Sequence, residues 1–170
     1  IVYFDDDDYY PPERISHAVD TLRSNKKALI AGSSKLHIYF NHNEKVYSFG
    51  PYGPRHSTAG TFAFKRDLLK YTRYEDEKAL AEEKTFLKNY EIPLVHMDPM
   101  KVILVFSHEH NTFDKRELLE QQSKVVKETT LVPSDFIKDE ELRNFYVKEV
   151  NNKLKDYEPG EVKNKPDVLK

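Results

Sequence analysis

Residues 36–49 read LHIYFNHNEKVYSF, and this stretch decides the fold. Leu36, Ile38 and Phe40 alternate with more polar side chains, which is the pattern of a half-buried β-strand. Residues 41–44 favour a turn, and extended character resumes after them. The stretch therefore predicts a β-hairpin.

Other apolar runs extend the predicted sheet on both sides of the hairpin. Residues 102–106 read VILVF, an unbroken β-branched and aromatic run that predicts a strand buried on both faces at the centre of the core. Shorter runs at residues 28–31 and 61–64 indicate further strands. Because the strands come as hairpin-like pieces between separate helices, we predict an α+β fold with an antiparallel, sandwich-like β core and peripheral α-helices.

The predicted helices share apolar residues at helical spacing or a composition rich in Glu, Lys, Ala and Leu. They cover residues 12–24, residues 67–89 with a break near residues 72–76, a segment from the capping-box pair Asp114 and Glu117 through Val126, and a last segment from Leu142 to Leu154. No internal repeat interrupts this order.

The 170 residues divide into three regions by composition. Residues 1–11 form an acidic and aromatic N-terminal arm. Residues 12–158 have the size and hydrophobic content of a single globular domain. Residues 159–170 contain Lys, Glu and Pro without apolar periodicity, and we expect a flexible C-terminal tail.

Composition and charge argue against several classes of function. The chain has no cysteine, which excludes disulfides and thiolate chemistry. A net charge of −2 gives no general attraction to nucleic acid, and no apolar run is long enough for a membrane span. The five glycines do not form a phosphate-binding loop, and the opening residues lack the features of a signal peptide. We therefore expect neither a nucleic-acid nor a membrane partner, and no cofactor.

Two His-x-Thr triplets offer the one catalytic hypothesis. They are His56 with Thr58 and His110 with Thr112, and a pair of such triplets is the hallmark of two-histidine phosphodiesterases. Two imidazoles could act as acid and base across a phosphate whose oxygens the threonines hold. However, that family places each triplet on a strand with an apolar middle residue, whereas here one triplet lies in a Pro/Gly loop and the other just before a helix. We therefore predict no catalytic residue and keep this hydrolase as the alternative.

Two further clusters could begin a metal site. His108 and His110 lie on one side of an extended segment, but no third ligand is suggested. The run Asp5 to Asp8 lacks the alternating ligands and central glycine of a calcium-binding EF-hand loop. We therefore predict no bound metal, and a solvated acidic arm at residues 5–8.

Several blocks of the chain occur in an order that resembles the baculovirus polyhedrins and granulins, the matrix proteins of viral occlusion bodies. The blocks are Val2-Tyr3-Phe4-Asp5 with Tyr9-Tyr10 and, after a helix, Lys26-Lys27; Phe86 through Glu91-Ile92-Pro93-Leu94-Val95, then Met100 to Val105; and Val132-Pro133-Ser134-Asp135-Phe136-Ile137. They cover about half of the chain. The chain is shorter than those proteins, lacks their cysteine and has a smaller basic cluster, which fits a divergent, nudivirus-like member of the family.

The resemblance implies a structural protein, not an enzyme, that self-assembles into the crystalline occlusion body of an insect DNA virus. Such a body forms in the nucleus of the infected cell, protects embedded virions and dissolves at alkaline pH. The implied partners are further copies of the chain and the virions. Four adjacent carboxylates repel one another unless cations match them, so we expect lattice contacts at Asp5, Asp6, Asp7, Asp8, Tyr9 and Tyr10.

Overall fold

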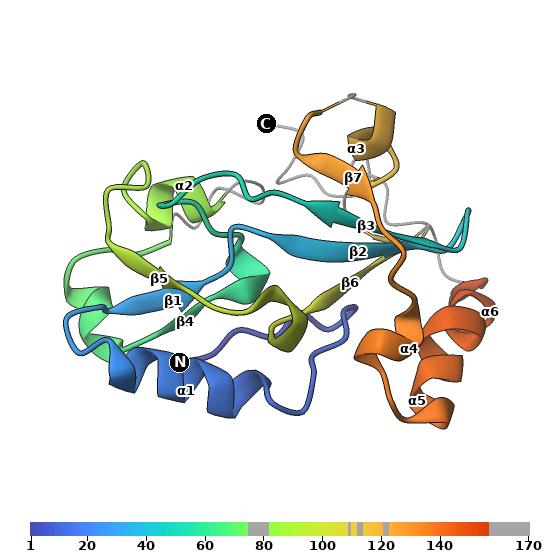
Figure 1. Cartoon of the computed structure of the whole chain (residues 1–170), viewed down its shortest axis with the longest axis horizontal. Coiled ribbons are helices and arrows are strands. Elements are labelled where there is room, and N and C mark those ends of the chain that lie inside the picture. Colours follow the sequence, from blue (N-terminus) through green and yellow to red (C-terminus); the bar gives the residue numbers. More distant parts are fainter. Residues whose placement is uncertain (75–81, 109, 112–113, 121–122, 157–170) are drawn as a thin grey trace.

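The computed structural model describes residues 1–74, 82–108, 110–111, 114–120 and 123–156, so the predicted tail at residues 159–170 lies outside the described residues. Two β-sheets with helices around them confirm the α+β class (Figure 1). The first sheet has the order β4 (Ala63–Phe64), β1 (Ile30–Gly32) and β5 (Leu94–His96); the second has the order β6 (Leu104–Ser107), β2 (Leu36–Phe40), β3 (Lys45–Phe49) and β7 (Val126–Glu128).

The predicted hairpin is confirmed as β2 and β3. The two strands pair antiparallel with Leu36 opposite Phe49 and Phe40 opposite Lys45. All five residues of β2 are buried, because its alternate side chains enter two different hydrophobic clusters. The strand is therefore buried on both faces, where the sequence predicted a half-buried strand.

Each sheet contains one parallel pair in addition to the antiparallel pairs that the sequence predicted. β1 pairs parallel with β5, and β2 pairs parallel with β6. The chain passes from β1 into β2, and from β5 through a short 3₁₀ helix, η3 (Pro99–Lys101), into β6. A parallel pair needs a long crossover connection, which residues 50–93 supply between the two segments.

The described residues form three hydrophobic core clusters. The central cluster includes Ile38, Ala63 and Val105 and joins the two sheets. The second cluster includes Tyr39 and Phe106 and lies on the opposite face of the second sheet. The third cluster lies on the face of the first sheet opposite the central cluster and contains several aromatic side chains, among them Phe62, Phe64 and Phe86. Both sheets are therefore covered on both faces.

Strand β6 is buried as predicted, although it lies at one edge of its sheet. The N-terminal segment covers this edge: the backbone N–H of Tyr9 donates to the carbonyl of Leu104 at 3.0 Å, and the N–H of Leu104 donates back to the carbonyl of Tyr9 at 2.9 Å. The preceding Val102 and Ile103 are buried although they precede the strand. Because the N-terminal segment covers this edge strand, the strand can consist of a continuous apolar run.

The described helices lie around the sheets. They are α1 (Arg14–Ser24), two 3₁₀ helices η1 (Ala59–Thr61) and η2 (Arg66–Lys70), α2 (Glu82–Phe86), α3 (Glu117–Glu120), α4 (Pro133–Phe136), α5 (Glu140–Asn144), the π-helical turn η4 (Phe145–Glu149) and α6 (Val150–Leu154). The last three run on as one helical segment, which confirms the prediction over residues 142–154. The helix predicted from Asp114 through Val126 is wrong at its end, because Val126 begins β7 and pairs with β3. The break predicted near residues 72–76 falls partly on residues 75–81, which lie outside the described residues, as do residues 121–122 after α3, so the full lengths of the two helices predicted over these residues are not described.

Candidate functional site

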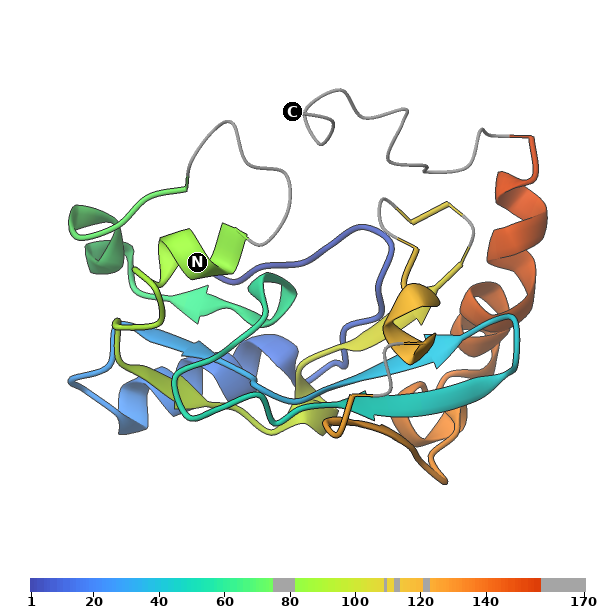
Figure 2. The same cartoon turned by 90° about the horizontal axis from the view of Figure 1, so that it is seen from above.

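The N-terminal segment, residues 1–11, is folded onto both sheets. Val2 forms an antiparallel bridge with Ala63 of β4, and Tyr9 forms one with Leu104 of β6. Figure 2 shows the segment crossing from the first sheet towards the second. The sequence predicted a solvated acidic arm at residues 5–8, which is wrong for the buried Asp8, whereas Asp5 and Asp6 are exposed. Contacts at two points hold the segment on its own chain.

The four aspartates lie in graded surroundings. Asp5 and Asp6 are exposed, Asp7 is half-buried, and Asp8 is only 7% exposed. One carboxylate oxygen of Asp8, Oδ1, accepts a hydrogen bond from the backbone N–H of Phe106 at 2.9 Å. Burial, and after it the negative charge of Asp7, raises the pKa of Asp8 to about 7. The segment thus carries a buried carboxyl group that holds its proton up to neutral pH.

Polar contacts on either side fix the turn that carries the acidic run. Asp7 accepts a hydrogen bond at Oδ2 from the amide nitrogen of Asn111 at 2.9 Å. The hydroxyl of Tyr10 accepts from the backbone N–H of Asp5 at 2.8 Å and donates to the carbonyl of Gly60 at 3.2 Å. Within the described residues, no cation forms a salt bridge with any of the four aspartates.

Arg14, the first residue of α1, is buried next to this segment. It was not identified from the sequence. It is 1% exposed, and its Nη2 donates to the carbonyls of Thr61 at 3.0 Å and Phe62 at 2.9 Å. Burial lowers its pKa to about 10. A signal was present, since Arg14 precedes Ala18 and Leu22 at intervals of four residues and so shares their apolar helix face.

The first His-x-Thr triplet lies in the loop between β3 and η1. The ring of His56 is 4.7 Å from that of Tyr52 and 5.1 Å from that of Tyr90. Burial, and then the charge of His96, lowers the pKa of His56. Nδ1 of His56 and the hydroxyl of Thr58 are buried without a hydrogen-bond partner in the described structure.

The second triplet lies after β6, in different surroundings. The backbone N–H of His110 donates to Nδ1 of His108 at 3.2 Å, and the backbone N–H of His108 donates to the side chain of Asn111 at 2.8 Å. Thr112 lies outside the described residues. Among the described residues, the contacts of the two triplets have no member in common. No hydrogen bond or ring contact among the described residues joins the two triplets.

The histidine and aspartate clusters that were considered as possible metal sites lie apart from further ligands where the structure describes them. Within the described part of the chain, no group of three or more His, Asp or Glu side chains could hold a metal ion. His108 and His110 have ring centroids 6.1 Å apart, and Glu109 between them lies outside the described residues.

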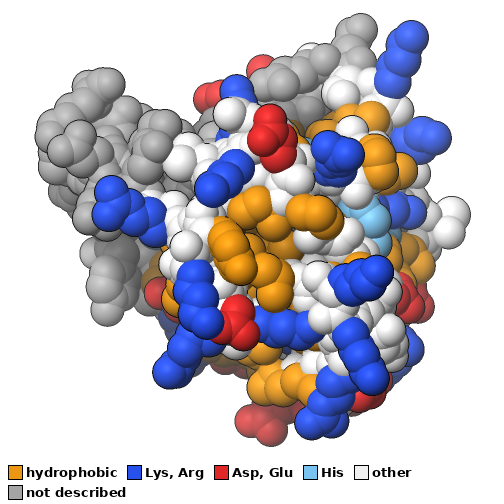
Figure 3. Space-filling view, turned by 90° about the vertical axis from the view of Figure 1, so that its left-hand side faces the viewer, with side chains coloured by type: hydrophobic (Ala, Val, Ile, Leu, Met, Phe, Trp, Pro, Cys, Tyr) orange, Lys and Arg blue, Asp and Glu red, His pale blue; other side chains and the backbone are white. Residues whose placement is uncertain are grey.

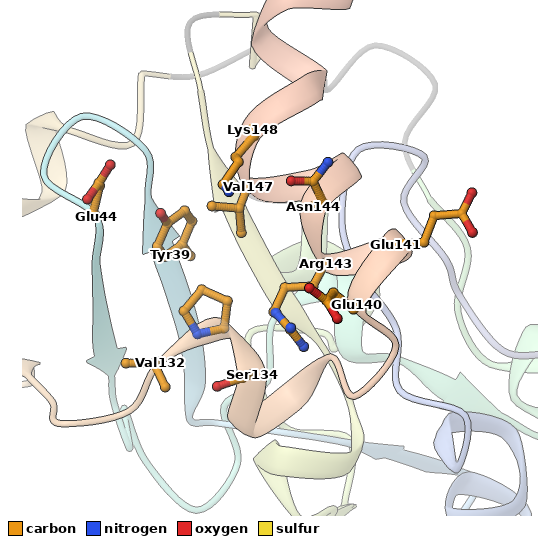
Figure 4. Close-up of a pocket in the computed structure, with 11 residues that line it drawn as sticks. Tyr39, Glu44, Val132, Ser134, Glu140, Glu141, Arg143, Asn144, Val147 and Lys148 are labelled. Atoms are coloured by element: carbon orange, nitrogen blue, oxygen red, sulfur yellow. The ribbon is translucent and has the colours of Figure 1, made fainter.

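A cleft of about 810 Å³ lies between the β2–β3 hairpin and helices α4 and α5 (Figure 4). Tyr39 reaches it from β2, and Glu140 and Arg143 from α5. Arg143 is partly engaged, because its Nη1 donates to the carbonyl of Ile137 at 3.0 Å. The hydroxyl of Ser134 also lines the cleft, but no histidine is among the 11 lining residues, so the nucleophile–base pair of acyl transfer is not formed there.

None of the helices in the described ranges has both the length and the hydrophobicity that a membrane span requires. Comparison of the chain with models of protein families, with curated protein sequences and with solved structures finds no match.

Proposed function

We propose that this chain is a structural protein that assembles with copies of itself into an ordered array, as in the matrix of a viral occlusion body. The resemblance to polyhedrins and granulins supports the proposal, with the nucleus of an infected cell as the site of assembly and virions as the enclosed cargo.

The single observation that carries the proposal is the presentation of Phe4, Asp5 and Asp6. Phe4 is 50% exposed, and Asp5 and Asp6 are exposed residues without a salt bridge to a described cation, although partial burial raises the pKa of the Asp5 carboxyl group. The backbone bridges of Val2 and Tyr9 hold this turn in place. An exposed aromatic ring beside unmatched like charges, on a fixed backbone, is suited to a contact with another molecule that supplies apolar surface and cations.

Exposed hydrophobic side chains on several different elements give further support, since a three-dimensional array needs contacts in more than one direction. They include Ile15 on α1, Leu69 on η2, Tyr71, Val132 and Leu142. Single exposed hydrophobic residues are common on monomeric proteins, so they add to the argument without carrying it.

The test is to express the chain in insect cells and to examine the cells by electron microscopy and X-ray powder diffraction. We expect dense particles of micrometre size with lattice diffraction. A chain that stays monomeric in cells and in concentrated solution would contradict the proposal.

The alternative is a two-histidine phosphodiesterase that uses His56 with Thr58 and His110 with Thr112. The unpartnered polar atoms of His56 and Thr58 favour it, and the separate surroundings of the two triplets oppose it. We expect no cleavage of 2′,3′-cyclic nucleotides. Cleavage that disappears in both His56→Ala and His110→Ala would replace the structural proposal with the enzymatic one.

A further inference from the structure

An open apolar groove of about 520 Å³ lies between the C-terminal half of α1 and the segment that follows β4. Its apolar lining is formed by Ile1, by Val19 and Leu22 of α1, and by Phe64 of β4. Figure 3 views the end of the molecule that lies on the left in Figure 1, where α1 ends, and shows hydrophobic side chains on this face with Lys and Arg side chains, and some Asp or Glu side chains, around them.

All charged side chains that line this groove are positive. They are Arg23, Lys26, Lys65 and Arg66, and none of them forms a salt bridge with a carboxylate in the described structure. The Nζ of Lys65 donates to the backbone carbonyl of Lys26 at 3.0 Å, which links the two sides of the groove. The nearby Asp67 is paired with Lys70 at 2.6 Å instead. Four cations around an apolar floor in a chain of net charge −2 make a surface that favours an anionic, partly apolar partner.

The turn at Phe4, Asp5 and Asp6, which we call the acidic knob, has the complementary chemistry. Its aromatic ring lies 4.5 Å from the ring of Tyr10 and 5.9 Å from the guanidinium carbon of Arg14, and Phe4 is still 50% exposed. These contacts fix the position of the knob on the surface of its own chain, where its exposed side chains can contact another molecule.

We propose that the acidic knob of one molecule docks into the basic groove of a second copy of the same chain. The aromatic ring lies against the apolar floor, and the two exposed carboxylates lie among the four cations of the groove. This inference rests on the proposed function and names the surfaces that would build the array.

The knob and the groove are different surfaces of one chain, so the contact can be head-to-tail. A head-to-tail contact leaves a free knob and a free groove at the two ends of each pair, and it therefore propagates into rings or open arrays. A knob of three residues buries less area than a stable dimer interface, so a single contact is weak and many contacts together hold the array.

Two variants test the contact separately. Asp6→Lys changes the knob, and the double variant Lys26→Glu with Arg66→Glu changes the groove; in each, the other surface is intact. We expect each variant alone to associate at least about tenfold more weakly than the native chain in sedimentation experiments at low salt, because like charges then meet. A mixture of the two variants should form pairs, since the intact groove of one accepts the intact knob of the other.

Matched controls are Lys27→Glu, which changes a neighbouring charge outside the groove, and Glu91→Lys, an exposed charge change away from the knob. Both should associate as the native chain does, and circular dichroism should show all variants folded. If the native chain associates and the knob and groove variants associate equally well, or if the mixture forms no pairs, the knob–groove contact is wrong while the proposed function stands. If the native chain does not associate at all, both are wrong.

Discussion

The buried carboxyl group of Asp8, in the N-terminal segment, makes the stability of the folded chain depend on pH. Its pKa is raised from 3.8 to about 7 in the folded chain, so the folded state holds the proton more tightly than the unfolded state does. The stability that this proton contributes is fully present below about pH 4 and is lost as the pH rises through about 7. His37 acts in the opposite sense, because burial lowers its pKa to about 4, and the stability contributed by the neutral ring is lost as the pH falls from about 6.5 towards 4. The two effects offset each other between about pH 4 and pH 6.5.

We predict that Asp8→Asn removes the Asp8 effect, because an asparagine oxygen can still accept the hydrogen bond of Phe106 without carrying a charge. The difference in the free energy of unfolding, variant minus native chain, should increase by a few kcal/mol between pH 4 and pH 9. Each unit by which the pKa differs between the folded and unfolded states corresponds to about 1.4 kcal/mol. Urea denaturation at both pH values gives this difference. Asp6→Asn, which changes an exposed carboxylate of the same run, is the control and should show a smaller change; an equal change in both variants would contradict the prediction.

Arg14 is a second residue whose side chain reaches far beyond its own helix. Its guanidinium serves the carbonyls of Thr61 and Phe62 together, and the single nitrogen of a lysine cannot match that geometry. We predict that Arg14→Lys lowers the free energy of unfolding by about 3 kcal/mol, the scale of a lost charged hydrogen bond. Thermal denaturation measures this, with Arg23→Lys at the exposed end of α1 as the control. A loss of less than about 0.5 kcal/mol in both variants would show that the buried contacts of Arg14 are not stabilising.

At the scale of elements, the junction after β3 depends on a glycine. Gly50 has a φ of +93°, and a side chain there would meet the carbonyl oxygen of Ser34, between β1 and β2. The same carbonyl accepts a hydrogen bond from the N–H of Tyr52 at 3.1 Å, and the N–H of Gly50 donates to the carbonyl of Val125 at 2.9 Å. The backbone at this point thus joins the hairpin to the first sheet and to the approach of β7.

We predict that Gly50→Ala destabilises the chain by about 2 kcal/mol or more, because it combines an unfavourable φ with a backbone contact that cannot move away. Gly53→Ala in the same loop is the matched control, since nothing lies within 4 Å of a side chain added there. That control should change stability by less than about 0.5 kcal/mol. Denaturant unfolding of the two variants decides the matter, and equal stability of both would mean that the loop relaxes around the added methyl group.

The elements that the sequence predicted correctly are those set by local periodicity. The hairpin at residues 36–49 and α1 follow from side-chain spacing and from a proline or turn residue at their ends. The errors come from contacts distant in sequence. Val126 continues a helical pattern, but pairing with Phe49 makes it part of a strand. The apolar run at residues 102–106 can lie at a sheet edge because Tyr9 covers that edge.

The candidate site was predicted in part for the same reason. The acidic run was identified from composition alone, but which of its carboxyl groups is buried depends on Phe106, almost a hundred residues away in the chain. The basic groove could not be predicted, because its cations come from the end of α1 and from the segment after β4, and only the fold brings those segments together.

At the scale of the whole molecule, alkaline pH acts on folding and on assembly at the same time. Burial raises the pKa of several tyrosines, so the folded chain holds their protons more tightly than free tyrosine does: Tyr9, Tyr10, Tyr39, Tyr52, Tyr90 and Tyr146. The stability that these protons contribute is present below about pH 10, the ordinary value for tyrosine, and is lost above it. Lysines lose their charge in the same range whereas arginines keep theirs, so alkaline pH weakens a knob–groove contact whose four cations are two lysines and two arginines.

We therefore predict that assembled particles persist at neutral pH and dissolve above about pH 10. Turbidity of purified particles against pH gives the dissolution midpoint, and circular dichroism on the same samples gives the unfolding midpoint. Dissolution should come first, because a weak surface contact loses part of its charge attraction as lysines become neutral, whereas the buried tyrosines keep their protons to higher pH. Particles of the Lys26→Glu and Arg66→Glu variant, if any form, should dissolve at lower pH than native particles, since they begin with fewer cations at the contact. Native particles that remain intact at pH 11 and dissolve at pH 5 would instead place control of assembly in histidines or carboxylates.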